Sequence, residues 1–339
     1  MEKFIVHTQA QPLGSNVAES RTVVPASSFG IVLGMAGLGN CWHMAQSYWE
    51  VSHWIPDVLC GLTTVIWFAL VIGFIYKWFF QKDFALAELN HPVQCCFIGL
   101  LPLSTLLVAM WIYAFFPALA VMLIVLSVIG QLGFSMYRFG GMWRGGRRLK
   151  DTTAVIYLPS VAGNFVSAIA LAGIGYIDFG KLLFGAGLFS WLALESTIIN
   201  RLLVEDELSP AIRPTLGIQL APPVVGAVAY LGVSGGEVDL FFFSLMGYGF
   251  VQLLFLMRLL PWFWRSGLNP SFWAFSFGIT AVTLACMRAG TIAPHSFFAS
   301  AAPFIFILAN VAVIFLFILT AWLLMIGRLF KQQAFAAGT

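Results

Sequence analysis

The chain has 339 residues, of which 60% are hydrophobic and only 9% are charged, with a formal net charge of +3. Soluble globular domains carry about 25% charged residues, so this composition excludes an ordinary soluble protein and indicates an all-α, multi-pass membrane protein. Residues 1–24 are mixed and polar, without the apolar core of a signal peptide. The first apolar segment is therefore expected to direct membrane insertion. All five cysteines fall in predicted spans without metal-ligand spacing, and we expect them to be small buried hydrophobic residues.

Ten segments have the ~20 mostly apolar residues that a membrane-spanning helix needs. We expect spans near residues 27–49, 56–79, 92–113, 117–138, 153–175, 179–203, 214–233, 240–264, 271–289 and 297–327. The connections Phe115–Phe116 and Tyr176–Asp178 are so short that their flanking spans must form hairpins. The even count indicates five hairpins in one transmembrane domain over residues 27–328, between tails at 1–26 and 329–339.

The basic residues are distributed unevenly between the two ends of these spans. One end, which holds both termini, carries 15 of the 17 Lys and Arg residues, and the other carries only Lys181 and Arg288. Basic residues favour the cytoplasmic side, so both termini are predicted to be cytoplasmic. The other end is mildly acidic.

The odd-numbered spans contain helix-breaking residues near their middle, at Gly34, Pro102, Pro159, Pro222 and Gly278. The intervals of 68, 57, 63 and 56 residues form a loose repeat of about 60 residues, one hairpin each. Broken helices are tolerated in membranes where their backbone is buried in protein or lines a wet cavity. We therefore expect the odd spans, with Leu33 beside Gly34, to line a central pore. The alternative is that these are separate packing features, because membrane helices commonly contain Pro and Gly.

Phe277 lies beside the flexible position Gly278, where a large ring could occlude a pore. An ordinary packing phenylalanine is the alternative.

The odd spans carry almost no charge between their ends, apart from Arg288 near the outer end of span 9. A lining that compensates poorly for lost hydration favours large, weakly hydrated anions over small ones. The sign of the ion stays open on charge alone, since the cytoplasmic end is basic and the other end acidic.

Two ionisable residues lie inside even-numbered spans at matched depth, Glu195 and Arg258. Charges in a membrane are costly and mark functional sites or pairs. We expect an ion pair between two outer helices, with a proton-coupling role for Glu195 as the alternative.

The sequence contains no Ser/His/Asp set, no HExxH and no phosphate loop, so we expect no enzymatic activity, no cofactor and no metal site.

Several motifs together suggest a family. They are Phe29–Gly34 (FGIVLG), His91–Val93 (HPV), Tyr157–Phe165 (YLPSVAGNF), Gly217–Pro222 (GIQLAP), Gly235–Asp239 (GGEVD), Gly247–Leu253 (GYGFVQL) and Trp273–Gly278 (WAFSFG). The chain resembles the tellurite-resistance/dicarboxylate transporter family, which includes the slow anion channels of plant guard cells. The resemblance implies ten helices as five hairpins in quasi-five-fold symmetry around a central pore, a homotrimer, and occlusion of the pore by Phe277. Bacterial relatives often have proline where this chain has Val32, so a kink in span 1 would depend on Gly34 and Gly37.

The combined prediction is an anion channel, or channel-like transporter, of the bacterial inner membrane. Its partners would be small inorganic anions such as chloride and nitrate, or oxyanions, and membrane lipid, with no role for nucleic acid. The first alternative is a proton-coupled transporter of dicarboxylates or tellurite-type oxyanions. The second is a structural or sensory protein with a closed pore, in which the basic connection Arg138–Asp151 could dock a partner.

Overall fold

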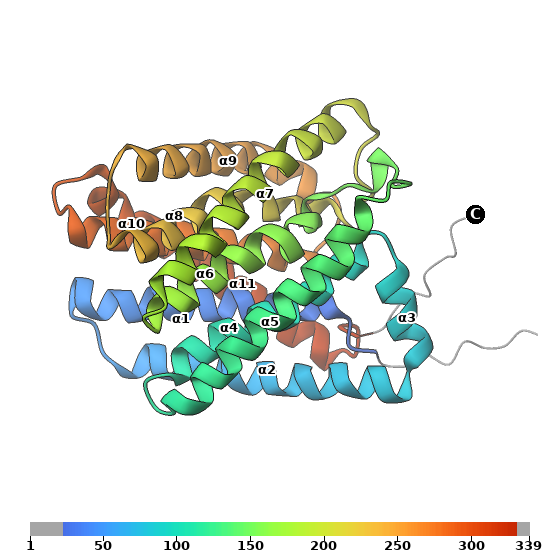
Figure 1. Ribbon diagram of the computed structural model, residues 1–339, viewed down its shortest axis with the longest axis horizontal. Coiled ribbons are helices and arrows are strands. Elements are labelled where there is room, and N and C mark those ends of the chain that lie inside the picture. The colour runs from blue at the N-terminus through green and yellow to red at the C-terminus, as the bar shows by residue number, and fades with distance from the viewer. Residues whose placement is uncertain (1–22, 331–339) are drawn as a thin grey trace, which may run out of the picture.

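The computed structural model describes residues 23–330, which fold into eleven α-helices and short 3₁₀ or π segments, with no strand in that range (Figure 1). The helices are α1 (Phe29–Trp49), α2 (Trp54–Phe80), α3 (Lys82–Asn90), α4 (Leu100–Ile112), α5 (Pro117–Met142), α6 (Gly163–Gly173), α7 (Ile177–Val204), α8 (Ala221–Ser234), α9 (Leu240–Trp264), α10 (Ser276–Ile292) and α11 (Phe297–Met325). The tails predicted at 1–26 and 329–339 lie largely outside the described residues.

Nine helical segments within residues 23–330 are long and apolar enough to cross a membrane, which confirms the predicted all-helical membrane fold. The remaining predicted span is α1, a helix of 21 residues that contains four glycines, Asn40 and His43. These residues lower its hydropathy below that of the other nine. Figure 1 shows α1 running through the bundle, with α2 at one edge and α9 at the other. The count of ten spans and the five-fold symmetry stay predictions.

The spanning helices divide into a buried set and an exposed set. In the spans that contain α4, α6, α8 and α10, between 56% and 89% of the most apolar stretch is buried. In α2, α5, α7, α9 and α11 this share is only 22–33%. The side chains of α1 are also mostly buried. The buried helices are the odd-numbered predicted spans, so the sequence distinguished the inner helices from the outer ones.

Irregular turns precede the inner helices, and four of the five predicted breaks lie in these turns or in the first helical turn that follows. Pro222 is the second residue of α8, and Pro102 and Gly278 are the third residues of α4 and α10. Proline is tolerated in the first turn of a helix, where its missing N–H would have no intrahelical partner. Pro159 lies inside a π turn. The preceding segments are η2 (Gln94–Gly99), η4 (Ala154–Ile156), η5 (Leu158–Ala162), η6 (Arg213–Leu220) and η7 (Pro270–Phe275).

Helix α1 is an exception to the predicted pattern, because it continues without a break through Gly34 and Gly37. A Cβ atom on Gly37 would lie 2.1 Å from the Thr280 Oγ1, and one on Gly34 would lie 2.3 Å from the Ser276 Oγ. The two glycines therefore allow α1 and α10 to pack backbone against side chain at close range. The helix break predicted at Gly34 is therefore not observed, and both glycines instead admit side chains of α10.

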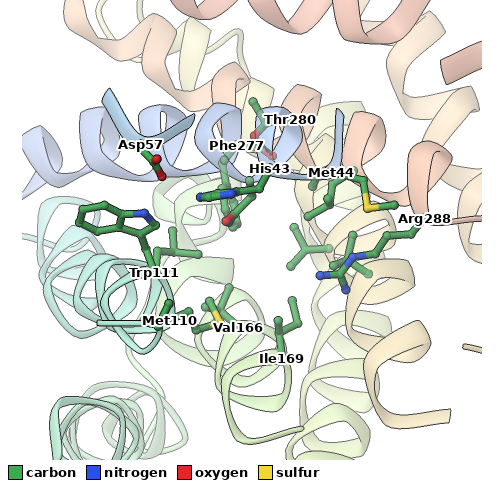
Figure 2. A pocket seen from close by; sticks show the side chains of 18 of the residues that line it. His43, Met44, Asp57, Met110, Trp111, Val166, Ile169, Phe277, Thr280 and Arg288 are labelled. Atoms are coloured by element: carbon green, nitrogen blue, oxygen red, sulfur yellow. Dashed lines mark hydrogen bonds between the residues drawn. The ribbon is translucent and has the colours of Figure 1, made fainter. Parts of the chain in front are cut away.

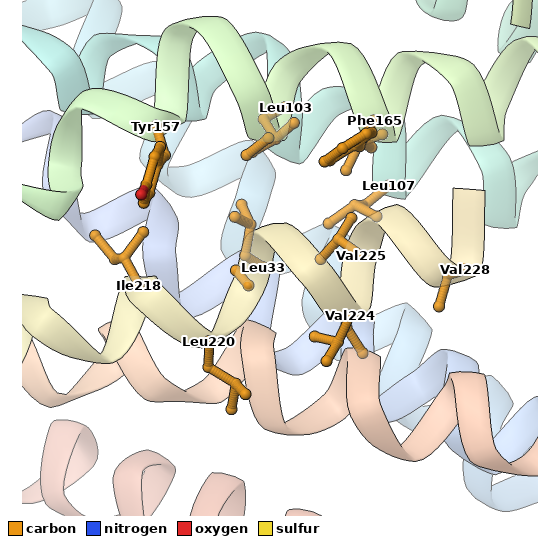
Figure 3. Close-up of a cluster of buried hydrophobic side chains, with 14 of the residues drawn as sticks. Leu33, Leu103, Leu107, Tyr157, Phe165, Ile218, Leu220, Val224, Val225 and Val228 are labelled. Atoms are coloured by element: carbon orange, nitrogen blue, oxygen red, sulfur yellow. The ribbon is translucent and has the colours of Figure 1, made fainter. Parts of the chain in front are cut away.

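Apolar side chains from the inner helices fill the spaces between them (Figure 3). Phe165 of α6 is fully buried, and its ring occupies the space left by two glycines of neighbouring helices. A Cβ atom on Gly187 of α7 would lie 2.8 Å from this ring, and one on Gly226 of α8 would lie 3.2 Å from it. Small residues opposite a large ring thus fix the spacing of α6, α7 and α8.

Candidate functional site

Two cavities lie along the inner helices, one at each end. The terminal cavity, with a volume of 320 Å³, is lined by the segments in which the inner helices begin, together with Pro25 and Leu329 near the two ends of the described chain. The distal cavity, with a volume of 580 Å³, is lined mainly by the later turns of α1, α4, α6, α8 and α10 (Figure 2). The same five helical segments therefore contribute to both cavities.

Phe277 is the one residue in the described part of the chain that lines both of these cavities. It is the second residue of α10 and is half-buried. The two cavities are separate volumes, and Phe277 forms part of the wall of each.

The neighbours of Phe277 explain where its ring points. Ser276 lies against Gly34 of α1, while Gly278 lies against Leu220 of η6, 3.0 Å from where its own Cβ would be. Successive residues of an α-helix are about 100° apart, so the Phe277 side chain projects between the directions of α1 and η6. That direction leads to the interior of the set of inner helices. Ser276 donates a hydrogen bond to the Trp273 carbonyl oxygen at 2.7 Å, which fixes the turn before Phe277.

The other predicted pore residues divide into two groups. Leu33 and Pro222 line the terminal cavity with Phe277. Gly34, Pro102, Pro159 and Gly278 line neither cavity. Pro159 lies in a π turn, and the Gln131 side chain of α5 donates a hydrogen bond to its carbonyl oxygen at 2.7 Å. This contact ties the outer helix α5 to the backbone of the turn before α6.

Few of the mild polar groups of the inner helices face the cavities. Asn40 and Thr280 line the distal cavity. The hydroxyl of Ser104 instead donates to the Leu101 carbonyl at 2.9 Å, and the amide of Asn164 donates to the Ser160 carbonyl at 2.6 Å. The lining is therefore less polar than the sequence predicted, which leaves charged groups as the main electrostatic features of the distal cavity.

Three titratable side chains line the distal cavity, Arg288 of α10, Asp57 of α2 and His43 of α1. Figure 2 shows Arg288 on the opposite side of the cavity from Asp57 and Trp111. Sequence reasoning placed Asp57 on the outer acidic face and Arg288 near the outer end of its span, but it did not bring the two to one cavity. The position of Asp57 in the first turn of an outer helix gave no signal that this residue lines the cavity.

Glu195 of α7 is buried and accepts hydrogen bonds from five neutral donors. Tyr157 and Tyr248 donate through their hydroxyls, and Trp191 donates through its indole N–H at 2.9 Å. The two remaining donors are the side-chain amides of Gln219 at 3.0 Å and Gln252 at 3.1 Å. Because Tyr157 also lines the terminal cavity, this network connects outer helices α7 and α9 to the cavity wall.

The predicted ion pair between Glu195 and Arg258 is absent from the part of the chain that the structure describes. Arg258 is exposed on α9, whereas Gln252 on the same helix faces Glu195. Six residues of an α-helix correspond to about 600° of rotation, so Arg258 points well away from the direction of Gln252. Neutral donors replace the cation that the sequence predicted.

A buried ion pair fixes the start of α1. Lys77 of α2 contacts Glu88 of α3 at 2.5 Å, with side-chain exposures of 1% and 8%. The other carboxylate oxygen of Glu88 accepts a hydrogen bond from the Ala26 backbone N–H at 2.8 Å, in the turn that precedes α1. The short helix α3 thus holds the entrance of the first inner helix, a contact that sequence reasoning missed.

Comparison with known proteins places these features in a family. The family of voltage-dependent anion channels matches residues 23–321. A Haemophilus influenzae protein named tellurite resistance protein TehA homolog is 38% identical over 311 residues, which cover 91% of this chain and 93% of that protein. The guard cell S-type anion channel SLAC1 of Arabidopsis thaliana is 22% identical over 293 residues, which cover 80% of this chain and 50% of the plant protein. The chain therefore spans nearly the whole bacterial relative but about half of the plant relative.

Proposed function

Because this chain belongs to the voltage-dependent anion channel family, we propose that it is an anion channel whose path runs through the two cavities and is closed at Phe277. Membership also confirms the resemblance drawn from the sequence motifs. The observation that carries the proposal is that Phe277 alone, in the described part of the chain, lines both cavities. A ring between two cavities blocks ions sterically and keeps the neck between them dry.

The composition of the lining supports a preference for weakly hydrated anions. The residues that line the terminal cavity together with Phe277 include Leu33, Ile218 and Pro222, which offer an ion no charge and no side-chain hydrogen bond. An ion that enters such a neck loses hydration without compensation. Nitrate and similar large anions lose less hydration free energy than chloride does when they enter the neck. We therefore expect the permeability of an anion to increase as its dehydration becomes easier.

The orientation proposed here follows from the distribution of basic residues. The terminal cavity opens at the end that carries most Lys and Arg residues, so it would face the cytoplasm of a bacterial cell. The distal cavity, with Arg288 and Asp57, would then face outward.

We further propose a homotrimer, in which exposed apolar side chains of the outer helices pack against neighbouring protomers and lipid. Native mass spectrometry in detergent tests the assembly.

A second candidate function is proton-coupled transport of dicarboxylates or tellurite-type oxyanions. Two observations favour it: the tellurite-resistance name of the 38% identical relative, and the buried carboxylate of Glu195, which has no cationic partner within residues 23–330. A buried carboxylate that gains and loses a proton could couple transport to a proton gradient. Against this, Glu195 lines neither cavity.

Reversal potentials of the purified protein in a planar bilayer separate the two candidates. Chloride, nitrate and proton gradients are to be varied one at a time, in wild type and in Phe277→Ala. A channel predicts a reversal potential that follows the anion gradient and ignores the proton gradient. A reversal potential that moves with pH at a fixed anion gradient would reject the channel and favour coupled transport.

A further inference from the structure

Arg288 lines the distal cavity, and its guanidinium has no hydrogen-bond or ion-pair partner in the described part of the chain. Within residues 23–330, it makes no hydrogen bond and has no carboxylate oxygen within 4.0 Å. Arg213 pairs with Glu207 at 2.9 Å, Arg148 with Asp151 at 3.0 Å, and Arg147 donates to the Pro92 carbonyl at 3.0 Å. The residue is partly buried, yet its nitrogen atoms stay accessible from the cavity. Five N–H donors are thus left for a ligand.

The surroundings of Arg288 make this guanidinium suitable for an anion. It lines the distal cavity together with the apolar side chains of Ile169, Val225, Val228 and Leu284. A charge beside apolar walls is screened less than one in open water, so its attraction for a counter-ion is stronger. The cavity volume of 580 Å³ far exceeds the ~30 Å³ that one water occupies. A small anion can therefore enter with part of its hydration shell.

The one carboxylate of the distal cavity does not neutralise this cation. Asp57 lies across the cavity from Arg288, beside Trp111 (Figure 2), and forms no ion pair with it. Arg288 follows Phe277 by 11 positions on one continuous helix, which corresponds to about 16 Å along the axis at 1.5 Å per residue. The free cation is therefore well separated from the constriction.

We propose that Arg288 is the binding site for a small planar oxyanion, of the nitrate class, in the distal cavity. The planar guanidinium fork can donate two parallel hydrogen bonds to two oxygens of such an anion, whereas a halide accepts only at one point. Arg288 thus selects planar oxyanions by geometry before the dry neck selects by dehydration. As a step of permeation this inference rests on the proposed channel function, but the binding site itself can be measured without transport.

The binding test uses sodium nitrate and sodium chloride, each at the same ionic strength, with thermal unfolding of the purified protein as the readout. A ligand that binds the folded state raises the unfolding temperature. We expect a nitrate-specific rise in wild type, whose half-saturating concentration increases by ~10-fold or more in Arg288→Gln. The matched control is Lys181→Gln, which removes the other outer-side cation; Lys181 lines neither cavity and lies 3.6 Å from the exposed carboxylate of Asp178. General salt effects act on all variants alike and cancel in the comparison.

Two further variants sharpen the test. Arg288→Lys keeps the charge without the fork, so it should lose the preference for nitrate over chloride while still binding both; it also covers the case in which the glutamine variant folds poorly. Asp57→Asn removes the opposing charge and should strengthen nitrate binding. An unchanged nitrate response in Arg288→Gln, or an equal loss in Lys181→Gln, would overturn the site. Anion currents through the Phe277→Ala channel without that response would reject the site alone, whereas the response without any current would reject the channel alone.

Discussion

Tyr157 donates a hydrogen bond to the buried carboxylate of Glu195, and the same tyrosine forms part of the wall of the terminal cavity. The contact joins the turn before an inner helix to an outer helix. Four other neutral donors surround this carboxylate. The Glu195 carboxylate therefore helps to position the cavity wall through Tyr157.

Replacement of Glu195 by glutamine should destabilise the purified protein. The new amide presents two N–H donors to neighbours that are themselves donors, so hydrogen bonds to a charged group are lost and repulsive contacts arise. We expect a loss of about 2 kcal/mol in the free energy of unfolding, measured by chemical or thermal unfolding in detergent. Arg258→Gln, at an exposed site, should change it by less than about 0.5 kcal/mol.

The double variant Glu195→Gln/Arg258→Gln provides the control for this account. The two side chains do not pair in the structure, so their effects should add within ~0.5 kcal/mol. Recovery of stability in the double variant would show that they interact, and would restore the ion pair expected from the sequence.

Gly37→Ala should push α1 away from α10 and so destabilise the protein. The added Cβ would lie 2.1 Å from the Thr280 Oγ1 and 2.9 Å from its Cβ, and such overpacking costs about 1–3 kcal/mol. Thr280→Ala in the same chain should recover part of the loss, because it removes the Oγ1. Gly130→Ala in α5, where nothing lies within 4 Å, is the matched control and should be neutral or stabilising by up to ~1 kcal/mol. Equal unfolding temperatures of the two alanine variants would refute the close approach of α1 and α10.

Lys77→Met should weaken the attachment of α3 to the start of α1. It leaves the carboxylate of Glu88 buried without its cation, and the loss of one partner of a buried pair costs about 3–5 kcal/mol. Adding Glu88→Gln removes the unpaired charge and keeps an oxygen for the Ala26 N–H, so the double variant should be more stable than Lys77→Met alone. The test is the free energy of unfolding of wild type and the two variants; a double variant as unstable as Lys77→Met alone would contradict the buried pair.

The stability contributed by Asp239 should depend on pH. This exposed residue caps α9, and its pKa lies below the usual range because its carboxylate accepts hydrogen bonds from the Phe242 N–H and from the Tyr230 hydroxyl. A lowered pKa in the folded state means that the contribution is present above the ordinary Asp pKa of about 3.9 and is lost as the pH falls through the folded-state pKa. The decrease in unfolding temperature between pH 7 and pH 3 should therefore be smaller in Asp239→Asn than in wild type.

The sequence identified the inner helices because a helix break near mid-span, at proline or glycine, is tolerated in a membrane protein only where the backbone is buried in protein or lines a wet cavity. Pro102 and Pro222 lie in the first turn of the buried helices α4 and α8, directly after a 3₁₀ segment, and Pro159 lies in the π turn before α6. The break predicted at Gly34 is not observed, because a glycine that interrupts a helix and one that admits a neighbouring side chain are identical in sequence. Only the partner, Ser276, distinguishes them.

The error at Glu195 has a different origin. Position along a span predicts depth, and depth alone suggested Arg258 as the partner. The partner of Glu195 depends instead on which face of α9 points toward it. Tyr248 and Gln252 are four residues apart in the sequence, so they share one helix face. In the structure this face is turned toward Glu195. The meeting of Asp57 and Arg288 at one cavity depends on the packing of α2 against the inner helices, which no local pattern encodes.

Anion conductance of Phe277→Ala, compared with that of Phe275→Ala, tests the proposed closure most directly. Phe275 lies two positions earlier, and its ring packs against Phe263 and Phe272 with ring centres 5.2 and 6.0 Å away, outside both cavities. We predict that Phe277→Ala raises single-channel anion conductance strongly in a planar bilayer, that Phe277→Leu gives an intermediate increase, and that Phe275→Ala lowers stability without raising conductance. Equal conductance in the two alanine variants, or none in either, would show that Phe277 is a packing residue and would contradict the account.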